Sequence, residues 1–327
     1  MSVAPIPVVL FSHDDHSPLL DLLRPFLPRS LPLYSTLQTP GQPIAVYATF
    51  QPGAETGGEG GRRRSPWLIL ADLGNQLRFF CSYEAKTTLS EAERAEGEEL
   101  VGQALRLYLL EHHGGRDRIS IGAVPDIWTS CIERFFDTKP FSNSEIHYLL
   151  PQEVTESLPV NGSTKGGVVL PGGVVATEGR EEDVAEILST SEVPHPPAYI
   201  STRLPYTTVL RSVDSSTDPS TDSTAAATPS SIVAHCTTHR DGSIGTLYVS
   251  SSHRQRGLGA LVLRTRIARM FSPAEAPQHV NQDDRDAAAF CYVHAENAAS
   301  NALMRKVGMR KSDWEVWWAR VKLPLKA

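Results

Sequence analysis

The chain has 327 residues and a mass of 35.8 kDa, a length that corresponds to about two domains. Hydrophobic residues make up 40% of it, which is enough for ordinary cores and excludes a wholly disordered chain. Its 31 basic and 37 acidic residues leave a net charge of −6, which argues against a protein that grips phosphate backbones, so we expect no nucleic-acid partner.

The remaining bulk features indicate a soluble, cytoplasmic protein. The apolar runs are short and broken by Pro, Gly or charge, so none predicts a membrane-spanning helix. Residues 1–17 lack a basic segment, so we expect neither a signal peptide nor a mitochondrial presequence. The four cysteines stand far apart without a Cys-x-x-Cys or Cys–His cluster, which predicts neither a zinc site nor a disulfide framework. His112 and His113 end a predicted helix, where cations are ordinary, and we expect no metal there.

Three soft segments divide the chain. Residues 51–65 are rich in glycine and 212–231 contain one large apolar residue, so we expect both to be mobile insertions. Residues 161–173 are also rich in glycine and separate two halves of similar size. We therefore expect an N-terminal domain over 1–160, a linker over 161–180 and a C-terminal domain over 181–327.

The N-terminal half alternates predicted strands and helices. A helical spacing of leucines stops at Pro28, and Ser90 with Glu93 forms a capping box that opens a long helix. The predicted elements are a helix at 17–27, strands at 44–50, 67–72 and 77–83, a helix at 90–112, a strand at 119–123 and a helix at 126–136.

The C-terminal half repeats this alternation, which suggests that the two halves are divergent copies of one α/β unit. Its predicted elements are a helix at 181–189, strands at 207–211, 232–237 and 245–249, a helix at 258–271, a strand at 289–294, a helix at 297–307 and a strand at 314–321.

A glycine turn between the strand at 245–249 and the helix at 258–271 is the most informative local feature. Gly257 and Gly259 allow a sharp turn and remove side chains that would block a ligand. The N–H groups of the next helical turn suit a pyrophosphate, and Arg254 and Arg256 add positive charge. The turn lacks the third glycine of a dinucleotide fingerprint, because residue 262 is Val. On these residues alone, a phosphate site and an ordinary steric turn remain equally open.

Two blocks of residues resemble a known superfamily. Arg254-x-x-Gly257-x-Gly259, on a helix after an apolar strand, resembles the acyl-CoA signature of the GCN5-related N-acetyltransferase superfamily. The segment 291–294 followed by 297–309 resembles that superfamily's next strand, splayed gap and helix. The chain is most similar to the glycine N-acyltransferase-like, or FR47-like, branch, and the segment 27–34 resembles the amino-terminal domain of that branch.

The resemblance implies an α/β (α+β) fold of tandem domains, each with a mixed, mostly antiparallel sheet flanked by helices. It implies that acyl-CoA binds in the C-terminal domain, between the splayed strands 245–249 and 289–294, and that the N-terminal domain has no CoA site of its own. Backbone groups of Leu247 and Val249 would bond the pantetheine amides, and an N–H near Val249 would polarise the thioester carbonyl. Asn297 would reach the cofactor or simply cap its helix. The implied binding residues are Leu247, Tyr248, Val249, Arg254, Gln255, Arg256, Gly257, Leu258, Gly259, Ala260, Asn297 and Ser300.

The catalytic residues are less plainly indicated. Acylation needs a neutral amine, so a base must take a proton, and the departing thiolate needs one. Many relatives carry a Glu base where this chain has Ser243 and a Tyr acid where it has Met304. Tyr292 and His294 share one face of a strand and are the expected substitutes, although Tyr292 could pack as core and His294 could pair with Glu296 on the surface. Asp241 and His239 are weaker candidates.

The resemblance therefore implies an acyl-CoA-dependent N-acyltransferase that uses acetyl-CoA or another acyl-CoA and no metal. We expect the acceptor to be a primary amine of a small molecule or amino acid. Two alternatives remain open. The first is a protein or peptide N-acetyltransferase, and the second is a non-catalytic acyl-CoA-binding protein with a decayed site, which the missing Glu and Tyr favour.

Overall fold

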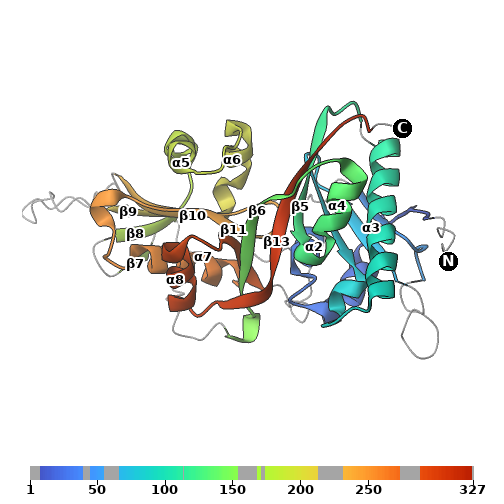
Figure 1. Ribbon diagram of the computed structural model, residues 1–327. Coiled ribbons are helices and arrows are strands. Elements are labelled where there is room, and N and C mark those ends of the chain that lie inside the picture. Colours follow the sequence, from blue (N-terminus) through green and yellow to red (C-terminus); the bar gives the residue numbers. More distant parts are fainter. Residues whose placement is uncertain are drawn as a thin grey trace, which may run out of the picture. The chain divides into compact units, whose positions relative to one another are not determined.

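The computed structural model describes residues 8–39, 45–54, 66–112, 114–153, 168–170, 174–212, 231–272 and 288–325. The chain divides into two compact units, both drawn in Figure 1. The first unit comprises residues 1–146, 293–297 and 311–327, and the second comprises 147–292 and 298–310. Most of the expected mobile insertions, namely 55–65 and 213–230, lie outside the described residues.

Most strands of a mixed sheet with the order β1-β2-β3-β4-β5-β13-β6-β12 belong to the first unit, whereas residues 289–292 of β12 and 147–149 of β6 belong to the second. Neighbours run antiparallel from β1 to β4, β4 and β5 are parallel, and β5 and β13 are antiparallel. The strands are β1 (Phe11–Ser12), β2 (Ala45–Ala48), β3 (Leu68–Asp72), β4 (Gln76–Cys81), β5 (Arg118–Pro125), β6 (Phe141–Leu149), β12 (Ala289–His294) and β13 (Arg310–Lys322). The helices of this unit are α1 (Ser17–Leu23), α2 (Leu31–Gln38), α3 (Glu91–His112) and α4 (Thr129–Phe136).

Strand β3 shows how this sheet separates two cores. Its side chains alternate between the faces. Leu68 and Leu70 pack into the core that includes residues of α3 and α4, whereas Ile69 and Ala71 pack into the core that includes residues of α1 and α2. All five residues of β3 are buried, as expected for a strand covered on both faces.

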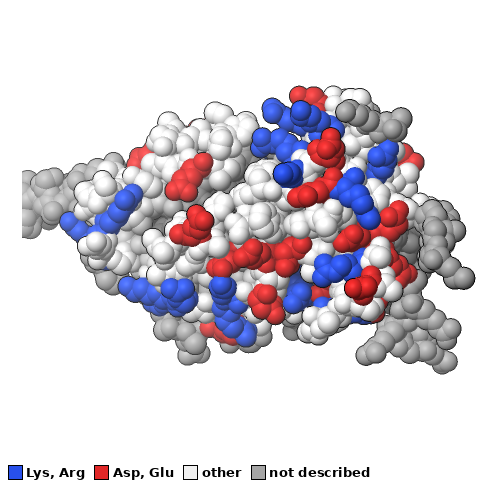
Figure 2. All heavy atoms as spheres, in the orientation of Figure 1, with Lys and Arg blue, Asp and Glu red and all other residues white. Residues whose placement is uncertain are grey.

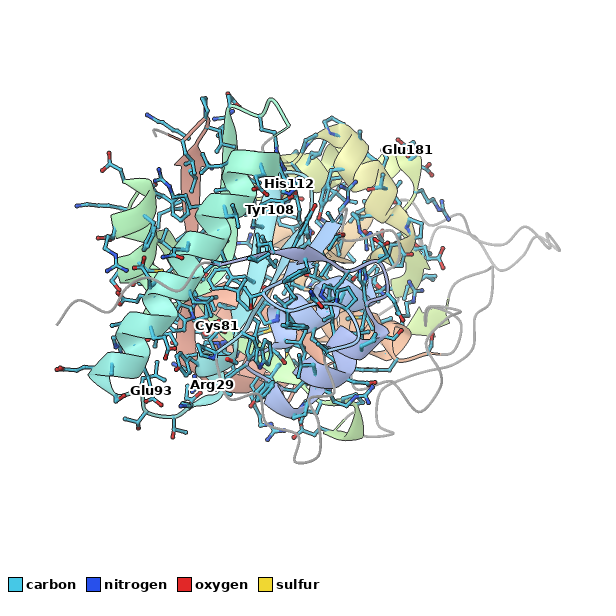
Figure 3. The ribbon with its side chains drawn as sticks, turned by 90° about the vertical axis from the view of Figure 1, so that its right-hand side faces the viewer. Arg29, Cys81, Glu93, Tyr108, His112 and Glu181 are labelled. Atoms are coloured by element: carbon cyan, nitrogen blue, oxygen red, sulfur yellow. The ribbon has the colours of Figure 1, made fainter. Side chains whose placement is uncertain are left out.

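His112 is accounted for by ring packing at the end of α3. Tyr108 and His112 lie one turn apart on this helix (Figure 3), with ring centroids separated by 5.0 Å. The His112 ring also lies 4.9 Å from the ring of Tyr47. His113 lies outside the described residues.

The second unit contains an antiparallel sheet with the strand order β11-β10-β9-β8-β7. Figure 1 shows α5 and α6 on one face of this sheet and α7 and α8 on the other. The strands are β7 (Val168–Leu170), β8 (Val174–Glu178), β9 (Thr207–Ser212), β10 (Ile232–Thr238) and β11 (Ile244–Val249), and the helices are α5 (Val184–Thr190), α6 (Pro197–Arg203), α7 (Leu258–Met270) and α8 (Ala298–Lys306). The predicted fold class, α/β with sheets flanked by helices, is confirmed.

The two units differ from the expected domains in which strands they contain. The last strand, β13, was expected in the C-terminal domain, but it belongs to the first unit because it pairs with β5 from Val316 to Lys322. Conversely, the end of β6 belongs to the second unit, where His147 Nε2 lies 2.7 Å from Asn301 Oδ1 on α8. The expected linker at 161–180 contains β7 and β8, two strands of the second sheet.

Every helix and strand predicted from the sequence is present within a few residues of its expected place, while α2, α6, β1, β6, β7 and β8 were not predicted. On the face drawn in Figure 2, basic and acidic side chains are interspersed. Within the described parts of the chain, no helix is both long enough and apolar enough to span a bilayer.

Candidate functional site

The connection from β11 to α7 has the backbone geometry of a tight glycine turn. A 3-10 turn at Ser251–His253 follows β11, and the chain then reaches Gly257, the residue that caps α7. Gly257 has φ of +81° and ψ of 0°, a left-handed conformation that favours glycine. Gln255 also has a positive φ, of 62°. The first turn of α7 contains no acidic residue, so its unpaired N–H groups and the helix dipole favour an anion.

Arg254 ties this turn to β11, and Gly259 lies near side chains of α8 and β11. A Cβ at Gly259 would lie 3.4 Å from the side chain of Leu303 on α8 and 3.5 Å from that of Val249 on β11. Arg254 Nε donates a hydrogen bond to the carbonyl of Val249 at 3.2 Å. Leu258 and Ala260 are buried, whereas Arg254, Gln255, Arg256 and Gly257 are exposed. The structure thus brings together the expected β11 residues, the turn and the start of α7.

Strand β11 is the edge strand of its sheet and contains a bulge. Between the pairs His235–Tyr248 and Thr237–Gly245, two residues of β11 face one residue of β10. The two residues of β11 in this bulge are Thr246, whose φ is +45°, and Leu247. A bulge re-aims backbone groups and is typical of functional edges. The bulge was not predicted from the sequence, although Gly245 inside a strand is a known signal for one.

Tyr248 is positioned by a buried histidine on the neighbouring strand. The ring of Tyr248 lies 5.7 Å from that of His235, which is buried on β10. Nε2 of His235 lies 2.9 Å from the hydroxyl of Thr190. Burial lowers the pKa of His235 to about 4, so its ring is neutral at neutral pH and acts as packing for β11.

The Ser243 hydroxyl is hydrogen-bonded within the turn before β11. Ser243 is buried, its Oγ donates to Asp241 Oδ1 at 2.6 Å, and its N–H donates to the same oxygen at 3.1 Å. The backbone N–H of His239 donates to the Ser243 carbonyl at 2.7 Å, and Gly242 has φ of +79°. These contacts close the β10–β11 hairpin. Ser243 therefore has a structural partner for each of its polar groups named here.

The two candidates on β12 belong to different units. Tyr292, in the second unit, is half-buried, and its ring lies 5.5 Å from that of Phe290 in an edge-to-face arrangement. His294, in the first unit, is exposed; its Nε2 lies 3.2 Å from Ser142 Oγ and its Nδ1 lies 3.0 Å from the carbonyl of Asn143. Both ring nitrogens of His294 are thus engaged by the start of β6.

Asn297 and Ser300 lie around the start of α8. Asn297 belongs to the first unit, stands directly before α8, and its backbone N–H donates to the carbonyl of His294 at 2.9 Å. Ser300 is half-buried in the first turn of α8, in the second unit. Met304, the residue in place of a Tyr acid, is buried and 4% exposed, so it serves as core.

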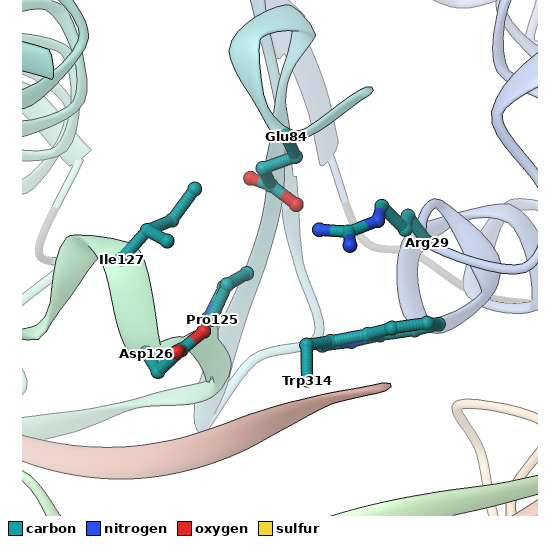
Figure 4. Close-up of a pocket in the computed structure, with 6 residues that line it drawn as sticks. All are labelled: Arg29, Glu84, Pro125, Asp126, Ile127 and Trp314. Carbon is teal, nitrogen blue, oxygen red and sulfur yellow. The ribbon is translucent and has the colours of Figure 1, made fainter. Parts of the chain in front are cut away.

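A small pocket in the first unit is a second candidate place. Figure 4 shows the Glu84 carboxyl and the Arg29 guanidinium pointing toward each other across it. Arg29 lies over the ring of Trp314, 5.0 Å from its centroid. One oxygen of Glu84 accepts hydrogen bonds from the Cys81 backbone N–H at 2.9 Å and from Trp128 Nε1 at 3.0 Å. Burial raises the pKa of Glu84 to about 8. Since the Glu84 carboxyl is already held by the protein, we do not place the acyl-CoA site here.

Comparison with known families identifies the C-terminal segment. Residues 225–319 match the model of the family described as FR47-like protein. This match covers the strands, the glycine turn and the helix described above. No curated protein matches the chain.

Solved structures show a likeness of fold. A Drosophila protein solved by X-ray crystallography superimposes with a TM-score of 0.58 at 15% identity, covering 96% of this chain and 99% of that one. A tandem GNAT protein from the clavulanic acid biosynthesis pathway has a TM-score of 0.47 at 13% identity, covering 98% and 100%. A GCN5-related N-acetyltransferase from Kribbella flavida has a TM-score of 0.40 at 12% identity, covering 77% and 86%.

At these identities the structural likeness concerns the fold alone, and the family rests on the sequence match. That match includes both blocks that resembled the superfamily, Arg254 to Gly259 and 291–309. Residues 225–319 match the FR47-like family, which confirms the resemblance to that branch seen in the sequence.

Proposed function

We propose that the protein is an acyl-CoA-dependent N-acyltransferase that moves an acyl group, most simply acetyl, to the primary amine of an amino acid or other small molecule. The observation that carries this proposal is the combination, in one unit, of a bulged edge strand with a left-handed glycine turn at the start of the next helix. The edge strand offers unpaired backbone groups, and the helix start offers N–H groups to phosphate.

The turn residues fit a pyrophosphate by charge and by space. No atom lies within 4 Å of the place where a Cβ of Gly257 would be, so the backbone there is open to a ligand. Arg254 and Arg256 flank the turn and add positive charge. In this proposal, the backbone of β11 binds the pantetheine arm through the bulge, and the N–H groups of the α7 start bind the pyrophosphate. The proposed binding residues are Leu247, Tyr248, Val249, Arg254, Gln255, Arg256, Gly257, Leu258, Gly259, Ala260, Asn297 and Ser300.

Among the catalytic candidates, the contacts favour Tyr292. Ser243 already donates its hydroxyl to Asp241, and His294 already has a partner at each ring nitrogen. A phenol, with a reference pKa near 10, is a poor base at neutral pH, but it is a suitable donor to a departing thiolate. Tyr292 therefore takes the role of proton donor. Positioning of the two reactants and polarisation of the carbonyl by the β11 backbone supply the rest of the rate.

The charge near the start of β11 favours an acceptor that carries a carboxylate. Arg203 is buried, with its Nε donating to the carbonyl of Thr238 at 3.0 Å, and the Arg240 guanidinium lies 5.3 Å from the centre of the Tyr199 ring. Two guanidinium groups beside this hairpin suit the carboxylate of an amino acid better than a basic peptide. This supports a small acceptor over a protein amine.

The non-catalytic alternative is favoured by one observation, the buried Met304 in place of a proton-donating tyrosine. A two-stage experiment separates the alternatives. Thermal shift with acetyl-CoA and with longer acyl-CoAs measures binding, and release of free CoA thiol is then followed against amino acids, simple amines and a lysine peptide. We expect stabilisation by acyl-CoA and thiol release with an amino acid. Stabilisation without thiol release from any amine would favour the acyl-CoA-binding alternative, and release with the peptide alone would favour a peptide acetyltransferase.

A further inference from the structure

Three rings lie together beside the start of β11, and we call them the His–Tyr cluster: His195, Tyr199 and His239. Tyr199 is on α6 and His239 is in the β10–β11 turn. The rings of His195 and Tyr199 stack at 4.9 Å with an interplanar angle of 21°, and those of Tyr199 and His239 stack at 6.0 Å and 18°. The Tyr199 hydroxyl is hydrogen-bonded to Nδ1 of His239 at 2.8 Å. This bond fixes the orientation of the His239 ring and leaves Nε2 on its opposite side.

Nε2 of His239 faces the backbone of β11. A Cβ at Gly245 would lie 2.5 Å from this atom, so His239 occupies its place only because residue 245 has no side chain. Gly245 stands directly before the bulge residues Thr246 and Leu247. The imidazole is thus held against the first residues of the edge strand that is proposed to carry the acyl-CoA. His195, Tyr199 and His239 are residues of intermediate exposure.

The groups around His239 keep its ring neutral at neutral pH. Burial is the largest effect and lowers the pKa of His239 to about 4; Asp241 opposes this shift, while His195 and Arg203 add to it. The other groups nearby are Arg240, over the Tyr199 ring, and Tyr199 itself, whose pKa is raised by burial and by Asp241. A neutral imidazole can accept a proton, which a histidine protonated at neutral pH could not do.

We propose that His239 accepts the proton of the acceptor amine, and that Tyr199 is the positioning residue that orients its imidazole. The proposal rests on the proposed N-acyltransferase function and adds to it the base that the motif residue Ser243 does not provide. In the productive tautomer of this proposal, Nδ1–H of His239 donates to the Tyr199 oxygen, and Nε2, which lies beside Gly245, carries the lone pair that takes the proton.

The step balances as follows. The acceptor enters as an ammonium ion, and one of its protons passes to Nε2 of His239. The neutral amine then attacks the thioester carbonyl, so that a C–N bond forms and the C–S bond breaks. The second proton of the amine ends on the CoA thiol, directly or through Tyr292, and the imidazolium of His239 returns its proton to solvent. The products are an amide, CoA and one proton.

The test compares His239→Gly, Tyr199→Phe and wild type in thiol release with an amino acid acceptor, with added imidazole as the rescue reagent. For His239→Gly we expect kcat/KM to fall about 10²-fold at neutral pH, the low end for general-base catalysis, because a base with a lowered pKa accepts a proton less readily. Acyl-CoA affinity should be unchanged, and free imidazole should restore much of the rate. Tyr199→Phe keeps the ring packing and should lower kcat/KM less, about 10-fold, without a change in acyl-CoA affinity.

His112→Gly in the first unit is the matched control, because it removes an imidazole that lies beside the rings of Tyr47 and Tyr108 and the carboxylate of Glu111, and it should be indifferent to added imidazole. Full activity of His239→Gly, or a loss that imidazole does not restore while Tyr199→Phe is fully active, would overturn the role of His239. If His239→Gly fails to fold, Tyr199→Phe still tests the proposal. An unchanged rate of thiol release with an unchanged pH profile in Tyr199→Phe would count against His239 as the base and Tyr199 as its positioning residue. An inactive wild type that binds acyl-CoA would instead refute the proposed function itself.

Discussion

The same strand–turn–helix arrangement occurs in both units, and the two copies differ at the start of the helix. In the first unit, β4 leads through a 3-10 turn to α3, and in the second unit β11 leads through a 3-10 turn to α7. At the start of α3, Ser90 and Glu93 form a capping box: the N–H of Ser90 donates to Glu93 at 2.9 Å, and the N–H of Glu93 donates to Ser90 Oγ at 3.3 Å. The first turn of α7 has no acidic residue and begins at the left-handed Gly257.

The starts of α3 and α7 also differ in charge, because only α3 has acidic residues in its first turn. Glu91 and Glu93 stand in the first turn of α3, and Glu93 pairs with Lys86. The hydrogen bond from Lys86, followed by those from Ser90, lowers the pKa of Glu93 to about 2, so its charge persists across the ordinary pH range. A pyrophosphate at α3 would meet two carboxylates and N–H groups that are already bonded. We infer that the first unit has no CoA site of its own.

The strands before the two helices differ as well. β11 is an edge strand with a bulge, whereas β4 lies between β3 and β5 inside its sheet. Arg78 of β4 is buried, and a Cβ at Gly122 of β5 would lie 1.7 Å from its Nη1. The Arg78 side chain thus fills the space beside β5. In the proposed function, the second unit binds acyl-CoA because its edge strand is open and the start of α7 has no side-chain cap, and the first unit serves as a scaffold because both places are filled.

The largest expected effect comes from placing a carboxylate at the open helix start. Gly257→Asp should abolish acyl-CoA binding, because a Cβ and a negative charge would occupy the place proposed for the pyrophosphate. Gly53→Asp in the first unit is a matched control, since Gly53 has the same φ of +81° and no atom within 4 Å of its missing Cβ. Both variants carry a similar backbone strain of about 1–2 kcal/mol. Calorimetric titration with CoA checks the result, and equal CoA affinity in Gly257→Asp and wild type would refute the proposed site.

The next effect concerns chemistry rather than binding. Tyr292→Phe should lower turnover about 10²-fold, because it removes the proposed proton donor to the thiolate. Acyl-CoA affinity should hardly change. Tyr83→Phe in the first unit removes a hydroxyl that donates to Glu96 at 2.5 Å and should leave turnover unchanged. Steady-state thiol release measures both variants, and full turnover in Tyr292→Phe would exclude Tyr292 from the relay.

The sequence was sufficient for most elements of the fold because their signals are local. The capping box predicted from Ser90 and Glu93 is present, and Gly257 adopts the left-handed turn that its position suggested. Helix α2 was missed because it is only eight residues long, follows Pro28 closely and is buried from Leu31 to Leu37, so it shows no amphipathic period. Short buried helices lack the signal that sequence patterns depend on.

Local sequence patterns could not predict that β13 belongs to the first unit and the end of β6 to the second. β6 was missed because its register depends on distant partners: the N–H of Ile146 bonds to Ser312 Oγ, and His147 bonds to Asn301. The His–Tyr cluster was missed for the same reason, since Tyr199 and His239 are 40 residues apart and meet only when α6 packs beside the hairpin. Gly245 was the one local sign of that close approach.

The smallest expected effect on thiol release comes from a change at Glu84. This change tests whether the first unit is only a scaffold. Its pKa is raised from the ordinary value of 4.5 to about 8 because the carboxyl is buried, with a smaller opposing effect from its hydrogen bonds and from Arg29. Between these pH values the folded state therefore holds a proton that the unfolded chain has released. The free energy of unfolding should accordingly fall as pH rises from about 4.5 to about 8.

Glu84→Gln should weaken this pH dependence while keeping the hydrogen bonds from the Cys81 N–H and from Trp128, because an amide oxygen can accept both. The melting temperature of the variant should drop less between pH 5 and pH 8 than that of wild type, and thiol release should be unchanged. Glu91→Gln, at an exposed position in the first turn of α3, is the control and should retain the wild-type slope. Scanning calorimetry at several pH values measures the slopes. A loss of acyl-CoA binding or turnover in Glu84→Gln would mean that the first unit takes part in the chemistry, and the contrast between the two helix starts would then no longer divide site from scaffold.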